Sequence, residues 1–210
     1  MKDETRHIRL NETKWDGWAK SIDSDGRTYR YLRRAQSKVI SLLEIKAGVT
    51  FLDIGCGTGW AVGQAAKLVN DRGSFYGVDL SPKMIEKAKE NFRDRDNFYF
   101  IKSNVESIPL GDKFFDIIFC TNSFHHYLHP EKALTEMRRL LKMGGKLYIL
   151  DPTADKWRVK IADKIIKLFE PEHVKIYSTK EFRELFTGVG LKYLATQMAN
   201  AHQKIHIGER

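Results

Sequence analysis

The chain has 210 residues, of which 42% are hydrophobic, and 36 Lys and Arg against 27 Asp and Glu give it a formal net charge of +9. This length and hydrophobic content suit a single globular unit with a sizeable core. No apolar stretch approaches a membrane span and no signal-peptide pattern opens the sequence, so we expect a cytoplasmic protein without transmembrane helices.

Helices and strands are predicted to alternate along the chain. In chain order we expect a polar segment over 1–28, then a helix over 29–44, a strand over 49–54, a helix over 60–70, a strand over 74–79, a helix over 82–93, strands over 97–102 and 114–120, a helix over 131–142, a strand over 145–151, helices over 157–169 and 178–187, and a hairpin over 191–198 and 202–208. This order predicts an α/β fold: a Rossmann-like, doubly wound, mostly parallel seven-stranded sheet with an antiparallel C-terminal hairpin. Residues 1–44 are interpreted as an N-terminal helical cap and 45–210 as the ligand-binding domain.

Three glycines at alternate positions follow the first predicted strand. Gly55, Gly57 and Gly59 let the backbone turn sharply and approach a ligand, and the loop opens into a helix N-terminus. The spacing is G-x-G-x-G, and Trp60 stands where the dinucleotide-binding pattern G-x-G-x-x-G has its last glycine. Asp53 before the loop repels a pyrophosphate but suits a cationic ligand. The pattern favours S-adenosylmethionine (SAM), with a plain strand-to-helix turn as the alternative.

The second predicted strand ends in another acidic residue. Asp79 lies twenty residues beyond Gly59, where a carboxylate can accept hydrogen bonds from both ribose hydroxyls of a nucleoside. Leu80 offers an apolar surface to the purine. The alternative is that Asp79 is an ordinary turn residue at the end of a strand.

These motifs together resemble those of class I SAM-dependent methyltransferases, especially the group that includes the ubiquinone and menaquinone C-methyltransferases. The resemblance covers residues 45–152 through the segments 52–59, 77–84, 104–110, 115–126 and 139–147. It implies SAM as cofactor and S-adenosylhomocysteine as product. The cofactor-binding residues it implies are Asp53, Gly55, Cys56, Gly57, Thr58, Gly59, Asp79, Leu80, Met84, Asn104, Val105, Asn122 and Ser123. Asn104 departs from the family, which more often has Asp there.

Candidate catalytic groups follow the fourth and fifth strands. Methyl transfer needs alignment of the reactants, and a base only for an unactivated acceptor. His126, next to His125, is the candidate base, and Asp151 is the second polar candidate over the acceptor. Alternatively, one histidine packs while the other hydrogen-bonds a carbonyl, and Asp151 is a turn residue before Pro152. No metal site is predicted, and the two cysteines are expected to be reduced.

The methyl acceptor is predicted to be small and partly apolar. The segment 121–124 lacks the Asn/Asp-Pro-Pro-aromatic signature of enzymes that methylate amino groups of nucleobases or glutamine. The candidate aromatic walls of the acceptor pocket are Trp15, Trp18, Tyr29 and Tyr31. The alternative is that these side chains simply belong to the hydrophobic core.

The basic charge keeps two further hypotheses open. Lys156, Lys160, Lys164 and Lys167 form a stripe on helix 157–169, opposite an apolar side. We interpret this helix as a cover with a solvated lysine face. The alternatives are a methyltransferase that docks on RNA, protein or lipid headgroups through this surface, and a SAM-binding protein without catalysis. The oligomeric state is open.

Overall fold

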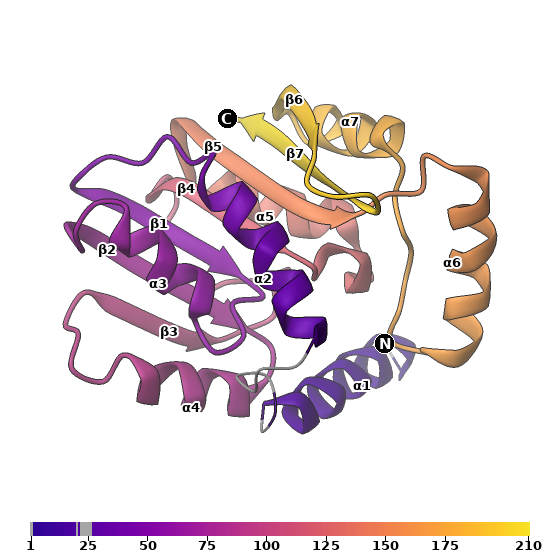
Figure 1. Ribbon diagram of the computed structural model, residues 1–210, viewed down its shortest axis with the longest axis horizontal. Helices are drawn as coiled ribbons and strands as arrows, with labels where there is room; N and C mark the ends of the chain where they lie inside the picture. The colour runs from indigo at the N-terminus through magenta and orange to yellow at the C-terminus, as the bar shows by residue number, and fades with distance from the viewer. Residues whose placement is uncertain (1, 20, 22–26) are drawn as a thin grey trace.

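The computed structural model describes residues 2–19, 21 and 27–210, which form one seven-stranded sheet with helices on both faces (Figure 1). The first half contains α1 (Lys2–Trp18), α2 (Arg27–Ile40), β1 (Val49–Ile54), α3 (Trp60–Lys67), β2 (Gly73–Asp79), α4 (Pro82–Asn91), β3 (Phe98–Lys102) and β4 (Phe115–Thr121). The second half contains η1 (Phe124–His126), α5 (Pro130–Leu140), β5 (Leu141–Pro152), α6 (Trp157–Phe169), α7 (Thr179–Gly188), β6 (Lys192–Met198) and β7 (Gln203–Glu209).

The order of the strands is β3-β2-β1-β4-β5-β7-β6. The five strands from β3 to β5 pair in parallel, and β7 pairs antiparallel with both β5 and β6. This topology confirms the predicted Rossmann-like sheet and its C-terminal hairpin. Because β1 and β4 are adjacent while the chain runs outward from each in opposite directions, the carboxyl ends of these strands form the crevice in which such folds bind ligands.

Alternating residues of the central strands bury both faces of the sheet. Phe51 packs toward the side that α2, α3 and α4 cover, whereas Leu52 and Ile54 pack toward α5 and α7. All three side chains are at most 1% exposed, as expected for parallel strands between two helical layers. The rigid sheet therefore fixes the loops at its carboxyl edge, where the candidate site residues begin.

Within the N-terminal segment, which the sequence describes as polar over 1–28 and as part of a helical cap over 1–44, residues 2–18 form the long helix α1. The residues of α1 that line the cavity described below recur at helical spacing: Glu4, His7, Ile8, Asn11, Lys14, Trp15 and Trp18. Most are polar, so the segment lacks the apolar stripe by which an amphipathic helix is recognised.

Helix α6 also differs from its interpretation as a cover helix. None of its residues is buried, and it stands at the outer edge of the molecule (Figure 1). Its large apolar side chains are exposed, with Leu168 at 81% and Phe169 at 80%. Neither this helix nor any other in the described ranges has the length and apolar composition needed to cross a bilayer.

Candidate functional site

The loop between β1 and α3 has the left-handed backbone that its glycines permit. Gly55, Gly57 and Gly59 have φ angles of 76°, 53° and 82°. A Cβ on Gly55 would lie 2.7 Å from the Ser123 Oγ, so this position excludes a side chain both by conformation and by contact. Gly59 is the N-cap of α3, which leaves the first amides of this helix free to face an anionic group of a ligand.

The carboxylate of Asp79 joins this loop to the start of α4. Its Oδ2 accepts a hydrogen bond from the Gly57 amide and its Oδ1 accepts one from the Ser81 amide, both at 2.9 Å. The Ser81 hydroxyl in turn caps α4 by accepting from the Met84 amide at 3.1 Å. Each carboxylate oxygen has a second lone pair, so Asp79 can hold the loop and still accept hydrogen bonds from ribose hydroxyls.

Two carboxylates beside the loop lack a protein cation. Asp53 is 1% exposed and its Oδ1 has no hydrogen-bond partner among the described residues. Burial and then the charge of Asp79 raise the pKa of Asp53 well above its usual range, and burial also raises the pKa of Asp79. None of the ion pairs in the described part of the chain includes either aspartate. A bound ammonium or sulfonium would favour the ionised form of these buried carboxyl groups, so a cationic ligand fits this site.

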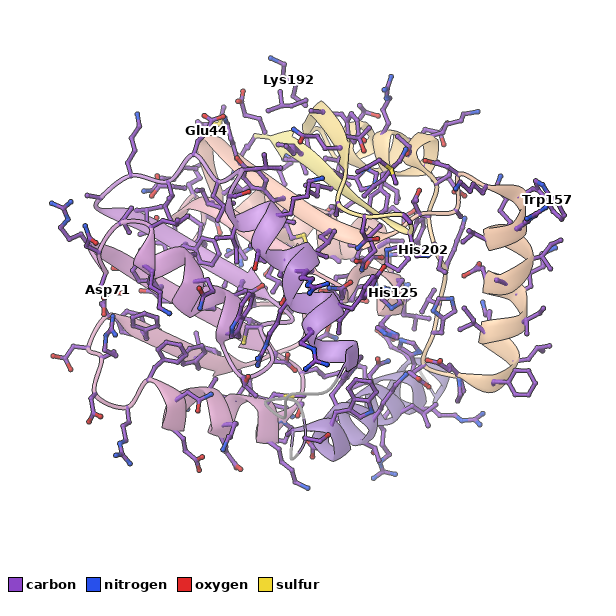
Figure 2. The ribbon with its side chains drawn as sticks, viewed as in Figure 1. Glu44, Asp71, His125, Trp157, Lys192 and His202 are labelled. Atoms are coloured by element: carbon purple, nitrogen blue, oxygen red, sulfur yellow. The ribbon has the colours of Figure 1, made fainter. Side chains whose placement is uncertain are left out.

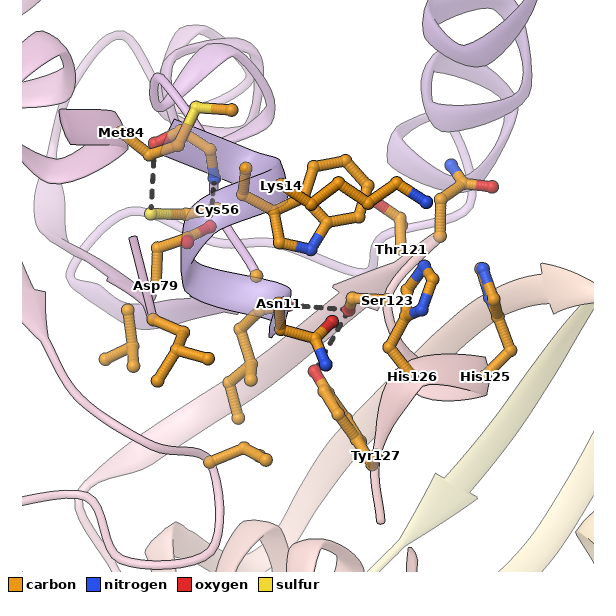
Figure 3. Close-up of a pocket in the computed structure, with 18 of the residues that line it drawn as sticks. Asn11, Lys14, Cys56, Asp79, Met84, Thr121, Ser123, His125, His126 and Tyr127 are labelled. Carbon is orange, nitrogen blue, oxygen red and sulfur yellow. Dashed lines mark hydrogen bonds between the residues drawn. The ribbon is translucent and has the colours of Figure 1, made fainter. Parts of the chain in front are cut away.

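A cavity of about 740 Å³ opens at the carboxyl edge of the sheet, a volume within the range of small-molecule sites (Figure 3). Most of the predicted site residues line it: Gly55, Cys56, Gly57, Thr58, Asp79, Leu80, Met84, Asn104, Val105, Asn122, Ser123 and His126. Asp53, Gly59 and Asp151 are not among its lining residues. The structure thus brings together residues from the ends of β1, β2, β3 and β4.

The polar groups after β3 and β4 are oriented by the loops that contain them. Asn104 uses its Oδ1 to accept from the Glu106 amide at 3.1 Å, which fixes the turn after β3. Asn122 has a positive φ of 56°, accepts a hydrogen bond from Gln203, and has an Nδ2 without a partner among the described residues. Ser123 bonds the Tyr127 hydroxyl at 3.0 Å. The unpaired amide of Asn122 is thus available to a ligand.

Helix α1 closes one side of the cavity and is tied to the rest of the site. The Ser81 hydroxyl donates to Asp16 of α1 at 2.5 Å, and the His7 Nε2 lies 2.8 Å from the His126 carbonyl oxygen. Lys14 pairs with Glu170 at 2.7 Å. Sequence reasoning placed Trp15 and Trp18 near the acceptor but missed the polar residues of α1, whose helical spacing was the available signal.

Aromatic side chains line the part of the cavity under α1. Trp15, Trp18 and Tyr31 all take part, and the side chain of Tyr29 lies outside the described residues. Trp15 makes edge contacts with Trp18 and His126, with ring centroids 5.6 and 5.5 Å apart. The cavity therefore combines a polar edge at the glycine loop with a wall under α1 in which aromatic rings lie among polar side chains such as Asn11 and Lys14.

The two adjacent histidines have different surroundings. His126 is 8% exposed, and burial together with the neighbouring His125 lowers its pKa to about 2. Burial thus makes His126 a weak proton acceptor in the cofactor-free structure, and its role as the base stays a prediction. His125 lines the cavity and places its Nδ1 2.9 Å from the fully buried Asp151. Asp151 thus contacts His125 and not the cavity, a pairing that sequence reasoning missed.

The fold and the site together define a Rossmann-like methyltransferase domain, and comparison with known proteins agrees. Residues 52–149 match the family described as methyltransferase domain. This part of the chain therefore belongs to the class I SAM-dependent methyltransferases, and the family implies SAM as the cofactor. The glycine loop and the carboxylate of Asp79, which both line the cavity, fit such a cofactor.

Two relatives and one solved structure illustrate the similarity. The chain is 30% identical to the uncharacterized methyltransferase YcgJ of Bacillus subtilis over 77% of its own length and 64% of that relative. It is 31% identical to the ubiquinone/menaquinone biosynthesis C-methyltransferase UbiE of Shewanella frigidimarina over 64% of the chain and 55% of UbiE. The crystal structure of YcgJ matches with a TM-score of 0.70 at 27% identity, covering 79% of this chain and 72% of YcgJ. The chain thus spans less than two thirds of the length of these curated relatives.

Proposed function

We propose that the protein transfers the methyl group of SAM to a small, partly apolar acceptor. The observation that supports this most is the continuity of one cavity, which runs from the glycine loop and Asp79 to the aromatic side chains of α1. A nucleoside-binding edge and a group of aromatic rings in one enclosure suit a cofactor and a partly apolar acceptor bound side by side.

The residues of the site would act mainly by binding and alignment. Bound SAM supplies a methyl group on a positively charged sulfur. Asp79 would accept hydrogen bonds from the ribose, Leu80 and Val105 would contact the adenine, and Asp53 would stabilise the positive charge of the cofactor. Helices α1 and α2 would form the cap, and the Trp15 ring would exclude water from the acceptor side. Alignment of the reactants and exclusion of water supply much of the rate acceleration of such a transfer.

The aromatic lining supports a ring-shaped acceptor, such as a quinone precursor or another phenol. UbiE is named for C-methylation in quinone biosynthesis, and the Trp15–Trp18 pair offers faces and edges on which a ring can pack.

Methyl transfer to a panel of acceptors tests this proposal. Purified protein with isotope-labelled SAM should produce S-adenosylhomocysteine with at least one quinol or phenol, and none with RNA or peptides. Trp15→Ala should raise the KM for that acceptor while leaving the affinity for S-adenosylhomocysteine unchanged, and the control Trp157→Ala, on exposed α6, should change neither. SAM binding without transfer to any acceptor fraction would instead indicate a non-catalytic SAM-binding protein.

A second candidate function is methylation of an acceptor held in a lipid bilayer. It is favoured by α6, in which Trp157, Leu168 and Phe169 are at least 66% exposed next to a stripe of lysines. Figure 2 shows Trp157 at the outer edge of the molecule, far from His125. An amphipathic basic helix of this kind can lie in the headgroup region of anionic membranes.

Co-sedimentation with vesicles separates the two candidates. If α6 docks on a membrane, the protein should bind phosphatidylglycerol vesicles but not phosphatidylcholine vesicles, and Leu168→Ser should reduce binding while the control Met143→Ser, equally apolar and 73% exposed elsewhere, does not. Absence of binding to either vesicle would leave the small acceptor in solution as the function.

A further inference from the structure

Three histidine rings come together beside the cavity. His125 and His126 belong to η1, and His173 belongs to the segment between α6 and α7. The ring centroids are 4.1 Å apart for His125 and His126, 5.6 Å for His125 and His173, and 6.2 Å for His126 and His173. One ring nitrogen of each residue lies within 4.8 Å of a ring nitrogen of the other two. Figure 3 shows the rings of His125 and His126 side by side at the edge of the cavity.

Each ring has one nitrogen held by an oxygen that can only accept a hydrogen bond. The His125 Nδ1 lies 2.9 Å from Asp151, and the His173 Nε2 lies 2.6 Å from Asp163. The His126 Nδ1 lies 3.2 Å from the carbonyl oxygen of Glu172. Because these partners accept, the proton belongs on the bonded nitrogen and the other nitrogen of each neutral ring has a lone pair. Histidines that bind metals are oriented in this way.

The charges around the cluster favour a bound cation. Asp151 is fully buried, and its Oδ2 has no hydrogen-bond partner among the described residues. Asp163 is the second carboxylate that contacts the cluster, and its side chain is 18% exposed. Asp151 and Asp163 therefore each place a carboxylate in direct contact with one ring of the cluster. A single divalent cation bound to the three rings balances both carboxylates.

We propose that His125, His126 and His173 bind a divalent transition-metal ion of the zinc type. Imidazole nitrogen is a preferred ligand for Zn²⁺ and its first-row neighbours. Tetrahedral bonds of about 2.0–2.1 Å place ligand nitrogens about 3.3 Å apart, so small ring rotations bring nitrogens that now lie within 4.8 Å into coordination. Asp151 and Asp163 would fix the rings from behind.

The cluster lies between two cavities. His125 and His126 line the main cavity, and His173 lines a smaller one of about 260 Å³. Three protein ligands leave a fourth position open, as in catalytic zinc sites. On the side of the main cavity this position would take a water or an oxygen atom of the acceptor. That assignment of the open position rests on the proposed function, whereas the ion site does not.

No metal site is predicted from the sequence, in which His173 lies 47 residues beyond His126 and no short spacing connects the three histidines. The prediction depended on local motifs, and this site is formed only by the fold.

Metal titration of the full chain tests the proposal without SAM or an acceptor. After dialysis against a chelator, the protein should bind one Zn²⁺ per chain by calorimetry, should unfold at a higher temperature with Zn²⁺ present, and should give the strong visible absorption of tetrahedral Co²⁺. His125→Ala should reduce the affinity for Zn²⁺ at least about 100-fold. Asp163→Asn, which leaves the ligands in place, should reduce it about 10-fold to 100-fold. The matched control His202→Ala, in the main cavity but outside the cluster, should bind like the wild type.

The proposal is overturned if the wild type shows neither stoichiometric Zn²⁺ binding nor stabilisation by Zn²⁺, two results that need no variant to fold. It is also overturned if His125→Ala binds as tightly as the wild type, or if His202→Ala loses as much affinity. A chain that fails these tests but still binds S-adenosylhomocysteine would refute the metal site alone and leave the methyltransferase function intact.

Discussion

Asp79 holds the glycine loop and the start of α4 with one carboxylate, and Asp79→Asn is predicted to weaken binding of S-adenosylhomocysteine by about 100-fold. Both carboxylate oxygens accept backbone hydrogen bonds, from Gly57 and Ser81, at 2.9 Å. Asparagine has a single acceptor oxygen, so its NH₂ group would face one of these two amides. The substitution therefore disturbs the loop and also removes charge from the atoms that would receive the ribose hydroxyls.

The magnitude follows from the number of hydrogen bonds to the charged group. One hydrogen bond to a charged partner contributes about 1.5–3 kcal/mol, and each 1.4 kcal/mol changes a dissociation constant about tenfold. Loss of one ribose contact together with a partly disordered loop amounts to about 3 kcal/mol, or roughly 100-fold.

Titration calorimetry with S-adenosylhomocysteine measures this change directly. The control is Asp94→Asn, which makes the same chemical change at a side chain that is 87% exposed and should bind like the wild type. Thermal unfolding of each variant shows whether the fold is retained. If folded Asp79→Asn binds within about twofold of the wild type, the assignment of Asp79 to the ribose is wrong.

Three further predictions concern the glycine loop, the buried Asp53 and the segment before β4. Gly55→Ala should lower the unfolding temperature and should weaken the binding of S-adenosylhomocysteine at least about tenfold, because φ is 76° and the new Cβ would contact Ser123. The control Gly111→Ala, with no neighbour within 4 Å of the new Cβ, should change neither quantity in the same assays. Burial raises the pKa of Asp53, so the folded state binds its proton more tightly than the unfolded state. The contribution of Asp53 to the stability of the cofactor-free protein is therefore fully present below the ordinary Asp pKa and is lost as pH rises through the raised one. In a pH series of thermal unfolding, Asp53→Asn should reduce this loss of stability with rising pH and should raise the unfolding temperature at neutral pH. The same substitution should weaken SAM binding. If the pH series of the variant equals that of the wild type, the buried Asp53 carboxylate does not cause the loss of stability. Arg139→Lys should lower the free energy of unfolding in urea by about 2 kcal/mol, because Arg139 donates to the Ile108 and Leu110 carbonyl oxygens and a lysine cannot make both hydrogen bonds in this geometry. An unchanged free energy of unfolding would show that the segment 108–110 does not depend on these hydrogen bonds.

The sheet and the glycine loop were predictable because their signals are local. The strand over 49–54 was predicted with the bounds that β1 has, since an apolar run before a glycine turn has few alternatives. The helix over 157–169 was also predicted with the bounds of α6. Its environment was not, because the periodicity of a helix shows which side is apolar but not whether another element covers that side.

The parts of the site that sequence reasoning missed depend on contacts between distant segments. The pairing of His125 with Asp151 joins the ends of two adjacent strands, and the approach of His173 depends on the path of the chain after α6. The bounds of α1 within the predicted N-terminal segment were not given for a different reason, because α1 turns polar residues such as Asn11 toward the cavity and apolar patterning does not detect such a face.

A crystal structure of the protein grown with S-adenosylhomocysteine and NADH together tests the central claim most directly. We predict S-adenosylhomocysteine alone in the cavity, with its ribose on Asp79 and its charged amino-acid end toward the glycine loop. NADH in that position, or S-adenosylhomocysteine bound anywhere else, would contradict the account.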